Sequence, residues 1–488
     1  MKKRIKGAIM AILTFACVCL SPNLFGAEST DVINVNSLEE LMPYLKKDNI
    51  HIKLAPGTYK YTTKEAGSRK YRNTAEVVQG KLTYALILIE GNGCTYDFTD
   101  VKIEVDTKVF NAYEGSEFVE LHVLGSNNVV KNLELEDIGH ALDFPQWGCV
   151  NVVVDGEKNR IEGVIVRSKG SFPYGYGELF GKGGPTTIKH KKHSAFLVRG
   201  LENHIKDCQI YHRAYGHCLF MQAADRPLIE GCYIEGALTT TDKVLEEAGT
   251  GSRADKIDFK TVWGYKVPKG YTIALTEAGI RAYNTGNTMI NGERFTKRTT
   301  SNATVRGCTV KNARVGVVIA HSAGKNLVED CTVIGVSSTG YSVNNNNTIR
   351  NCRADATFGP VFVVPYERNR NITADITITG YPKGENRYVG NGSKQVAYIV
   401  GTGHKITLRQ DPSLSMEDDV LEGMRISVGG DSESVGDLAE VKEWTATDIV
   451  LDNQTSFPVE LEKGVTGSTV TSVGKVTDIG SNNSITQK

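Results

Sequence analysis

The segment from residue 189 to residue 217 concentrates side chains that can transfer protons and bind anions. It holds five of the ten histidines of the chain, with six Lys or Arg residues against two acidic ones. The basic residues are Lys189, Lys191, Lys192, Arg199, Lys206 and Arg213, and the histidines are His190, His193, His204, His212 and His217. Because the whole chain has 56 basic and 56 acidic residues, this segment is a local cationic patch in a neutral protein.

These residue types suit β-elimination at a uronic acid. That reaction needs a cation against the sugar carboxylate, a base for the C5 proton and an acid for the leaving oxygen. The candidate cations are Lys192, Arg199 and Arg213, the candidate bases are His193 and His217, and the candidate acids are Tyr215 and a further histidine. The competing interpretation is a solvated basic face beside a ladder of histidines, with no chemical role.

The elements that must position these residues are visible as a repeat of the pattern apolar-x-x-Cys-x-apolar. The pattern surrounds Cys208, Cys232, Cys308, Cys331 and Cys352. Where nothing is inserted, successive cysteines are 24, 23 and 21 residues apart. A period of that length, made of short β-rich segments and Gly or Asn turns, is typical of one coil of a solenoid. We therefore interpret the cysteines as a column of small buried side chains, not as disulfides or metal ligands.

Counting from the cysteine column brings three histidines onto neighbouring coils. His217 aligns with His193, and His140 aligns with His217 when the first turn is two residues shorter. Successive coils lie about 4.8 Å apart, and strand alternation puts the small neighbours of the histidines inside. We expect His140, His193 and His217 to form one column on the outer face. Such a column is too long for zinc ligands, which must converge on one ion, so we expect no metal site.

The start of the chain adds a second signature. Ser37 and Glu40 form a capping-box pair ahead of a short amphipathic segment, and an I-x-L-x-P-G-x-Y strand follows at 52–59. Together with the coils, this start resembles the pectin-lyase-like superfamily over most of residues 30–380. The resemblance implies an all-β fold, a single-stranded right-handed parallel β-helix with an N-terminal capping helix and two long inserted loops. It also implies a secreted polysaccharide lyase or glycoside hydrolase.

The resemblance does not extend to the known catalytic signatures. The G-H-G motif of polygalacturonase-type hydrolases is replaced by Gly139-His140-Ala141 and Gly216-His217-Cys218, and the R-x-P-x-x-R motif of pectate lyases is absent. Calcium often assists such lyases, but no cluster of Asp and Glu in this sequence indicates a calcium site. The sequence itself requires no cofactor.

Residues 1–27 have the pattern of a signal peptide, with a basic start, the apolar run Ala8–Leu20 and a small-residue end at Ala27. We expect a protein that is secreted, periplasmic or at the cell surface; a lipoprotein anchored through Cys17 or Cys19 is the minor alternative. Residues 28–384 are predicted as the β-helix, and 385–488 as the last coils with a C-terminal β cap. We expect a monomer with no transmembrane span and no nucleic-acid partner, whose partner is an extracellular polysaccharide.

Two long insertions interrupt the repeat, at 168–192 and 237–302. Long insertions on a stiff scaffold often carry binding sites, although they can also simply pack over its side. The candidate substrate-binding residues are Arg199, Tyr174, Tyr176, Phe180, Lys189 and Lys191.

Two other classes of function stay open. A glycoside hydrolase needs two carboxyl groups roughly 5–10 Å apart, and the candidates are Asp143, Glu178, Asp255, Asp258 and Glu277. A non-catalytic glycan-binding or adhesin-like protein is the third class. Two large insertions flanking one basic cluster argue against this third class. The sequence favours a lyase acting on an acidic polysaccharide, because a cationic face beside aromatic loops can bind carboxylates and sugar rings.

Overall fold

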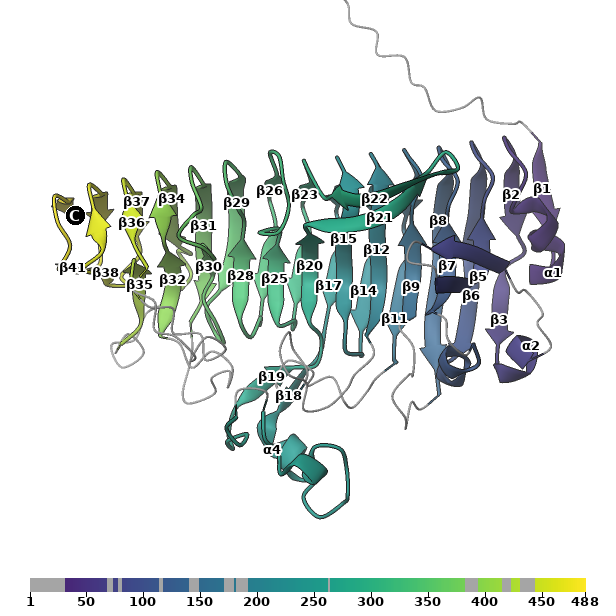
Figure 1. Cartoon of the computed structure of the whole chain (residues 1–488), viewed down its shortest axis with the longest axis horizontal. Coiled ribbons are helices and arrows are strands. Elements are labelled where there is room, and N and C mark those ends of the chain that lie inside the picture. Colours follow the sequence, from purple (N-terminus) through teal and green to yellow (C-terminus); the bar gives the residue numbers. More distant parts are fainter. Residues whose placement is uncertain are drawn as a thin grey trace, which may run out of the picture.

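The chain folds into one long stack of β coils (Figure 1). The computed structural model describes residues 31–67, 73–77, 81–113, 117–139, 149–170, 180, 192–261, 264–381, 394–414, 423–430 and 444–488. Within these residues no helix is long and apolar enough to cross a membrane. The predicted signal peptide lies outside them.

Each regular coil consists of three short strands. One coil is β13 (His204–Lys206), β14 (Gln209–His212) and β15 (His217–Asp225), and the next is β16 (Leu228–Glu230), β17 (Tyr233–Glu235) and β20 (Ala278–Tyr283). The coils stack in parallel, with His204 opposite Leu228, Gln209 opposite Tyr233 and His217 opposite Ala278. This arrangement confirms the predicted parallel β-helix.

The third strand of each coil belongs to a sheet that faces the viewer in Figure 1, here called the groove sheet. Its described strands are β4 (Asn73–Val77), β5 (Lys81–Ile89), β7 (Glu117–Val123), β9 (Cys149–Val154), β12 (His193–Leu201), β15, β20, β25 (Val315–Val318), β28 (Thr339–Ser342), β30 (Phe362–Val363), β32 (Gln395–Ile399), β35 (Arg425–Val428), β38 (Val459–Leu461) and β41 (Val476–Asp478).

The other two strands of each coil form the remaining wall of the stack. Its described strands are β1 (Val32–Val35), β2 (His51–Leu54), β3 (Gly57–Tyr61), β6 (Thr95–Asp106), β8 (Val129–Ile138), β10 (Arg160–Glu162), β11 (Ile165–Ser168), β13, β14, β16, β17, β23 (Thr304–Arg306), β24 (Thr309–Lys311), β26 (Leu327–Glu329), β27 (Thr332–Ile334), β29 (Thr348–Asp355), β31 (Thr373–Gly380), β34 (Lys405–Gln410), β37 (Val450–Gln454), β40 (Thr469–Ser472) and β42 (Ser484–Gln487). Coils thus continue through the region predicted as last coils and cap.

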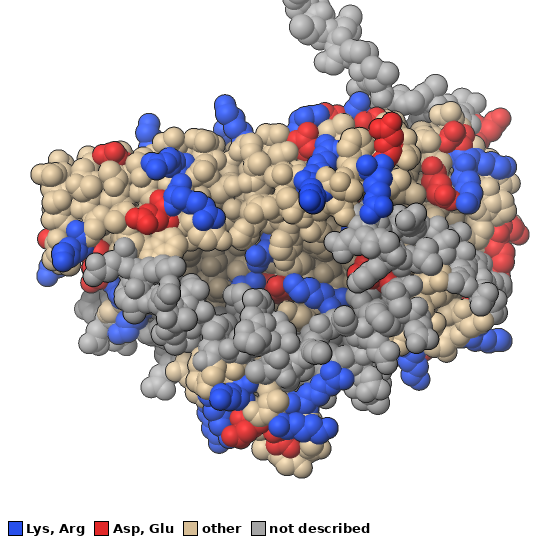
Figure 2. Space-filling view, in the orientation of Figure 1, with Lys and Arg blue, Asp and Glu red and all other residues tan. Residues whose placement is uncertain are grey.

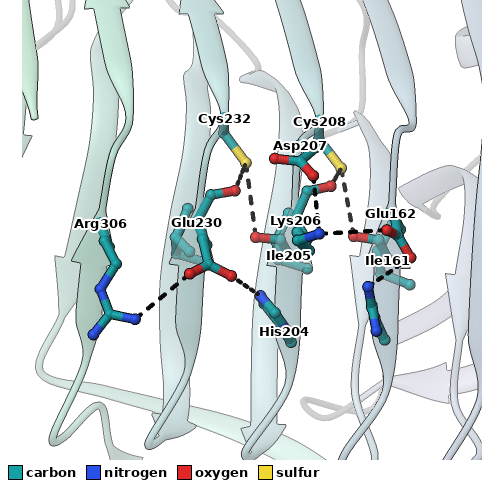
Figure 3. A network of polar contacts seen from close by, with 12 residues as sticks. Ile161, Glu162, His204, Ile205, Lys206, Asp207, Cys208, Glu230, Cys232 and Arg306 are labelled. Atoms are coloured by element: carbon teal, nitrogen blue, oxygen red, sulfur yellow. Dashed lines mark hydrogen bonds and ion pairs between the residues drawn. The ribbon is translucent and has the colours of Figure 1, made fainter.

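The repeated cysteines line the interior, as the repeat predicts. Cys208, Cys232, Cys308, Cys331 and Cys352 are at most 1% exposed, and all eight described cysteines are free thiols. Each of the five lies next to a carbonyl of the coil before it: the Cys232 thiol is 3.7 Å from the Ile205 oxygen, and the Cys208 thiol 3.6 Å from that of Ile161 (Figure 3). The cysteine side chains therefore pack as small apolar groups. Each thiol, a weak hydrogen-bond donor, lies next to a carbonyl oxygen that can accept from it.

The N-terminal cap uses the predicted pair Ser37 and Glu40 at a helix of four residues. Ser37 caps α1 (Leu38–Leu41), and its hydroxyl accepts a hydrogen bond from the Glu40 amide at 3.1 Å. The Glu40 carboxylate accepts from the amide of Asn36, one residue before the usual capping-box donor, at 2.8 Å. A 3-10 turn, η1 (Met42–Tyr44), follows directly. Leu38 and Leu41 are buried and close the first coil.

The outer face of the wall carries a column of charges whose sign alternates from coil to coil. Strand register places nine charged residues in line: Lys53, Asp97, Lys131, Glu162, Lys206, Glu230, Arg306, Glu329 and Arg350. Figure 3 shows its middle part, with Lys206 beside Glu162 and Arg306 beside Glu230. Arg306 also donates to Glu329 at 2.6 Å. Alternation avoids the repulsion that like charges on stacked coils would cause.

The second insertion is two excursions, not one. The sequence placed Gly279–Tyr283 inside the insertion, but β20 is a strand of the groove sheet. The first excursion holds β18 (Leu238–Thr240), α4 (Thr241–Leu245) and β19 (Thr272–Ala274) and hangs below the stack in Figure 1. The second is a hairpin of β21 (Thr285–Ile290) and β22 (Glu293–Thr299), which lies across the upper part of the groove sheet.

Candidate active-site groove

A hydrogen-bonded Tyr–His pair lies on the outer face of the groove sheet. His217 is the first residue of β15, and its neighbours Cys218 and Leu219 point into the core. Tyr283, at the end of β20, reaches back along the sheet, so that its hydroxyl is 2.6 Å from His217 Nε2. The ring of Phe220 lies 5.2 Å from the imidazole and 6.1 Å from the phenol ring. These contacts leave His217 only 2% exposed.

A carboxylate and a lysine complete the centre of this site. Glu277 directly precedes β20, and its amide donates to the Gly216 carbonyl at 2.8 Å. Its Oε2 atom lies 2.6 Å from Lys192 Nζ and 3.3 Å from His217 Nε2. Lys192 precedes β12, so residues from three successive coils meet here. Glu277 is 7% exposed, whereas the Lys192 side chain is 43% exposed and accessible to a ligand.

The environment sets the protonation states of these groups. Burial lowers the pKa of His217 to about 3. The Glu277 charge raises this pKa, whereas the charges of Lys192, Arg281 and Arg314 lower it further. Burial and the Glu277 charge raise the pKa of Tyr283 to about 12. Burial alone would raise the pKa of Glu277, but His217, Lys192 and Arg314 hold it well below its usual value. At neutral pH the site therefore contains a neutral imidazole, a neutral phenol and a carboxylate among cations.

Further cations extend the site toward the C-terminal coils. The guanidinium of Arg281 lies 5.0 Å from the ring centre of Tyr283, and its buried Nε has no hydrogen-bond partner among the described residues. Arg368 lies over the Tyr366 ring at 4.1 Å, and that ring is 6.1 Å from His321. In Figure 2 the middle of the molecule is hollowed below the hairpin, and both basic and acidic side chains gather in the hollow.

The described residues contain no group of three or more His, Cys, Asp or Glu that could hold a metal ion. The hydrogen-bonded Tyr283–His217 pair can transfer protons, and the cations close to it can bind an anionic group.

His193 and His217, the two described members of the predicted histidine column, do not lie side by side. Ser194, not His193, lies next to His217, and its hydroxyl accepts a hydrogen bond from the His217 amide at 3.2 Å. The predicted alignment of His193 with His217 assumed a constant offset of 24 residues, but a β-bulge changes the offset. β12 and β15 pair with an offset of 23 residues at Val198 and of 24 at Gly200. The extra residue in β15 is absorbed near Ala223, whose φ is 61°.

His193 is instead an interior residue. It is completely buried, its Nε2 is 3.4 Å from Asp137 Oδ2, and its ring packs edge-on against Phe110 at 4.7 Å. Its carbonyl accepts a hydrogen bond from His212 Nε2 at 2.9 Å. His193 therefore cannot contact a ligand in the groove, which corrects its assignment as a base on the outer face.

The other predicted residues divide between the groove, the core and other faces. Lys192 lies in the groove, and Tyr215 is buried beneath it, with Lys192 Nζ 5.8 Å from the ring centre. Arg213 donates to the Gly236 carbonyl at 3.3 Å and lies 3.7 Å from Glu235. The Arg199 side chain is 12% exposed and lies 3.6 Å from Asp155.

Phe180 is not a surface residue. It is completely buried in a small separate core with Val244 and Phe259, which corrects its assignment to substrate binding. His140, Tyr174, Tyr176, Lys189 and Lys191 lie outside the described residues, as do Asp143 and Glu178.

Sequence reasoning missed Tyr283, Arg281 and Arg314 as site residues, and it named Glu277 only as a hydrolase candidate. A signal was present for two of them. In β20 the small or apolar residues Ile280 and Ala282 point into the core, so strand alternation places Arg281 and Tyr283 outside. That inference required recognising β20 as a coil strand.

The comparison with protein families supports this architecture. A family model described as a right handed beta helix region matches residues 262–410. No curated relative matches the sequence. Similar solved structures include a mannuronan C-5 epimerase module from Azotobacter vinelandii, at 10% identity and a TM-score of 0.38 over 89% of each chain.

Another similar structure is an alginate lyase in complex with G6, at 15% identity and a TM-score of 0.45, covering 93% of this chain and 86% of that one. A third is a DFA-IIIase from Arthrobacter chlorophenolicus A6, at 10% identity and a TM-score of 0.35, covering 90% and 88%. These similarities assign no role to individual residues. The stacked parallel coils and the family match together make this chain a right-handed parallel β-helix protein, as its resemblance to the pectin-lyase-like superfamily predicted.

Proposed function

We propose that this protein is a carbohydrate-active enzyme that cleaves an acidic polysaccharide by β-elimination at a uronic acid. The observation that carries the proposal is the 2.6 Å contact between Tyr283 and His217, with the cations Lys192 and Arg281 close to it. A phenol on a neutral imidazole can move protons, and the cations can bind the sugar carboxylate.

In the proposed reaction, Tyr283 passes its hydroxyl proton to His217 Nε2 and its oxygen takes the C5 proton of the uronate. The C5–H electrons form the C4–C5 double bond as the C4–O bond breaks, and Tyr283 donates the proton taken from C5 to the leaving oxygen. His217 Nε2 then returns its proton to the Tyr283 oxygen, which restores both side chains. Lys192 and Arg281 stabilise the enolate-like charge on the carboxylate. Glu277, 3.3 Å from His217, stabilises the imidazolium that forms transiently.

Glycoside hydrolysis is supported less well by the described residues. A hydrolase needs a carboxylic acid with a raised pKa near a second carboxylate. The pKa of Glu277 is lowered, and Lys192 holds it as an anion. Asp255 accepts a hydrogen bond from the Gly251 amide and Asp258 pairs with Lys266, both within the first excursion.

The substrate would meet the enzyme outside the cytoplasm if the predicted signal peptide at residues 1–27 is used. We include export, and a contribution of calcium to activity, in the proposal.

The deciding experiment is the ultraviolet absorbance of the unsaturated uronate product. Purified wild type and Tyr283→Phe are incubated with a panel of acidic polysaccharides, with and without calcium. Wild type should produce the absorbance on at least one of them, and Tyr283→Phe should lower kcat by roughly 10²–10⁴-fold. The matched control is Tyr233→Phe, because Tyr233 lies on β17 outside the groove and pairs with Glu235.

Unchanged turnover in Tyr283→Phe would refute the role of the pair. New reducing ends without absorbance would indicate hydrolysis. Binding without either signal would indicate a glycan-binding protein.

A further inference from the structure

The β21–β22 hairpin is fixed to the body of the protein over a long distance. It begins two residues after Tyr283, where Gln222 Nε2 donates to the Thr285 carbonyl at 2.9 Å. Its tip reaches the turn after β7, where Asn291 Oδ1 is 2.9 Å from the Ser126 hydroxyl. That turn is four coils back, or about 19 Å, and six extended residues span about 20 Å. The hairpin therefore crosses the ends of β15, β12 and β9 (Figure 1).

A completely buried carboxylate anchors the middle of the hairpin. Asp155, after β9, is 1% exposed. Its Oδ1 accepts a hydrogen bond from the Thr288 hydroxyl at 2.7 Å and one from the Met289 amide at 3.3 Å. Its Oδ2 lies 2.8 Å from His122 Nε2 and 3.6 Å from Arg199.

The anchor makes the hairpin a fixed part of the groove rim. A buried carboxylate is expensive unless it is paired and hydrogen-bonded, and the hairpin supplies two of the donors to Asp155. The Gly156 amide adds a hydrogen bond to the Met289 carbonyl at 2.8 Å. Lifting the hairpin would break these three hydrogen bonds, which therefore hold it against the ends of the coils.

The outer strand of the hairpin is cationic and partly aromatic. The strand β22 contains three basic residues, Arg294, Lys297 and Arg298, and one acidic residue, Glu293. Its Phe295 is 39% exposed. Arg298 is engaged by Asp225 at 3.8 Å, whereas Arg294 and Lys297 have no ion pair with the described residues. Charged side chains on an edge strand also discourage pairing with other chains. Figure 2 shows Lys and Arg side chains along this upper border of the hollow.

We propose that the β21–β22 hairpin is a substrate-binding strap, whose residues Arg294, Lys297 and Phe295 bind acidic sugar units on the N-terminal side of the Tyr283–His217 pair. The inference rests on the proposed function, because it assumes that the groove takes an acidic polysaccharide. The cations supply charge for carboxylates, and the exposed ring supplies an apolar face for a sugar. Protection of an edge strand would need the same charges but would give no affinity for a glycan.

The test is equilibrium binding of polygalacturonate and alginate, with neutral dextran for comparison, at several salt concentrations. Arg294→Ala combined with Lys297→Ala leaves the Asp155 anchor intact. It should weaken binding of a polyuronate by roughly three- to tenfold and flatten the salt dependence. The control is Lys463→Ala combined with Lys475→Ala, since both lysines are exposed in the last coils.

Binding by wild type that the hairpin variant leaves unchanged would overturn the strap alone. Failure of wild type to bind either polyuronate would overturn the acidic substrate of the proposed function, and the strap with it.

The anchor is tested separately by hydrogen exchange of the amides at 285–299. Thr288→Val removes the hydroxyl donor and keeps the shape, so these amides should exchange faster and polyuronate binding should weaken in parallel. Thr296→Val, on the exposed strand of the same hairpin, should leave exchange unchanged. Equal exchange in the two variants would overturn the anchoring role of Asp155.

Discussion

Glu120 is a carboxylic acid inside the coil, and replacing it by glutamine should stabilise the protein at neutral pH. It lies on β7 between Val119, which pairs with Ala85, and Leu121, which pairs with Ile87. Its place in the preceding coil is taken by the fully buried Leu86. Glu120 is 1% exposed, and the carboxylate of Asp137, the amide of Asn151 and the thiol of Cys149 are near it. The imidazole of His193 faces Asp137 from β12 at 3.4 Å.

The pKa of Glu120 is raised well above its usual value, first by burial and then by Asp137. Below about pH 4 the carboxyl is protonated in both the folded and the unfolded chain, and the stability of the folded state is fully present. As the pH rises, the unfolded chain loses this proton while the folded chain keeps it. The free energy of unfolding then falls by about 1.4 kcal/mol per pH unit, until the folded carboxyl also ionises.

For a carboxyl that stays protonated up to pH 7, the loss between about pH 4.3 and pH 7 reaches about 3.7 kcal/mol. Glu120→Gln keeps the shape and cannot ionise, so its stability relative to wild type should rise steadily over this range. Urea denaturation of both proteins between about pH 4 and pH 7 measures the difference. A difference that does not change with pH would refute the reasoning.

A second variant checks the cause. Asp137→Asn removes the neighbouring negative charge, so the pKa of Glu120 should fall and the pH dependence of stability should end at a lower pH. An unchanged profile in this variant would show that Asp137 is not the charge that Glu120 senses.

Two further variants test the packing of the coils. Gly216→Ala should destabilise the protein by about 1–3 kcal/mol, because its Cβ would lie 2.1 Å from the His193 carbonyl oxygen. The control is Gly67→Ala in α2 (Thr63–Gly67), whose Cβ would meet no atom within 4 Å and should cost no stability. Equal thermal midpoints of the two variants would contradict this. Arg306→Glu should lower the urea midpoint by placing three carboxylates on successive coils, and the loss should shrink in about 1 M salt, where the screening length is about 3 Å. Lys463→Glu, at an exposed turn, is the control, and a loss independent of salt would argue against a role of the charge column.

The coil architecture could be predicted because each coil buries the same position. Cys308 and Cys331 both lie in the core column, so the apolar-x-x-Cys period survives in the sequence wherever no excursion intervenes. The capping pair of Ser37 and Glu40 was equally readable, since its hydrogen bonds join residues only three or four apart.

The site was less predictable, because its geometry depends on which residues of neighbouring strands lie opposite each other. That register is changed by a bulge and an excursion that have no sequence signature. The bulge near Ala223 shifts the register by one residue, and alanine is an unusual residue at a positive φ, so nothing in its type indicates the bulge. That single shift moves His193 from the expected outer column into the core. Tyr283 was missed because a long excursion separates it from His217, although the two are in contact across neighbouring strands.

The charge column could be recognised only from the register of the strands, not from the composition of the chain. Its members are irregularly spaced in sequence, since excursions of different length separate Glu230 from Arg306 but not Arg306 from Glu329. In composition they appear only as an equal number of acids and bases. Once the strands are in register, each charge between the two ends of the column faces opposite charges on the coils before and after it. A slip of one residue would break this pairing and turn the adjacent apolar residues outward, so the column and the core specify the same stacking.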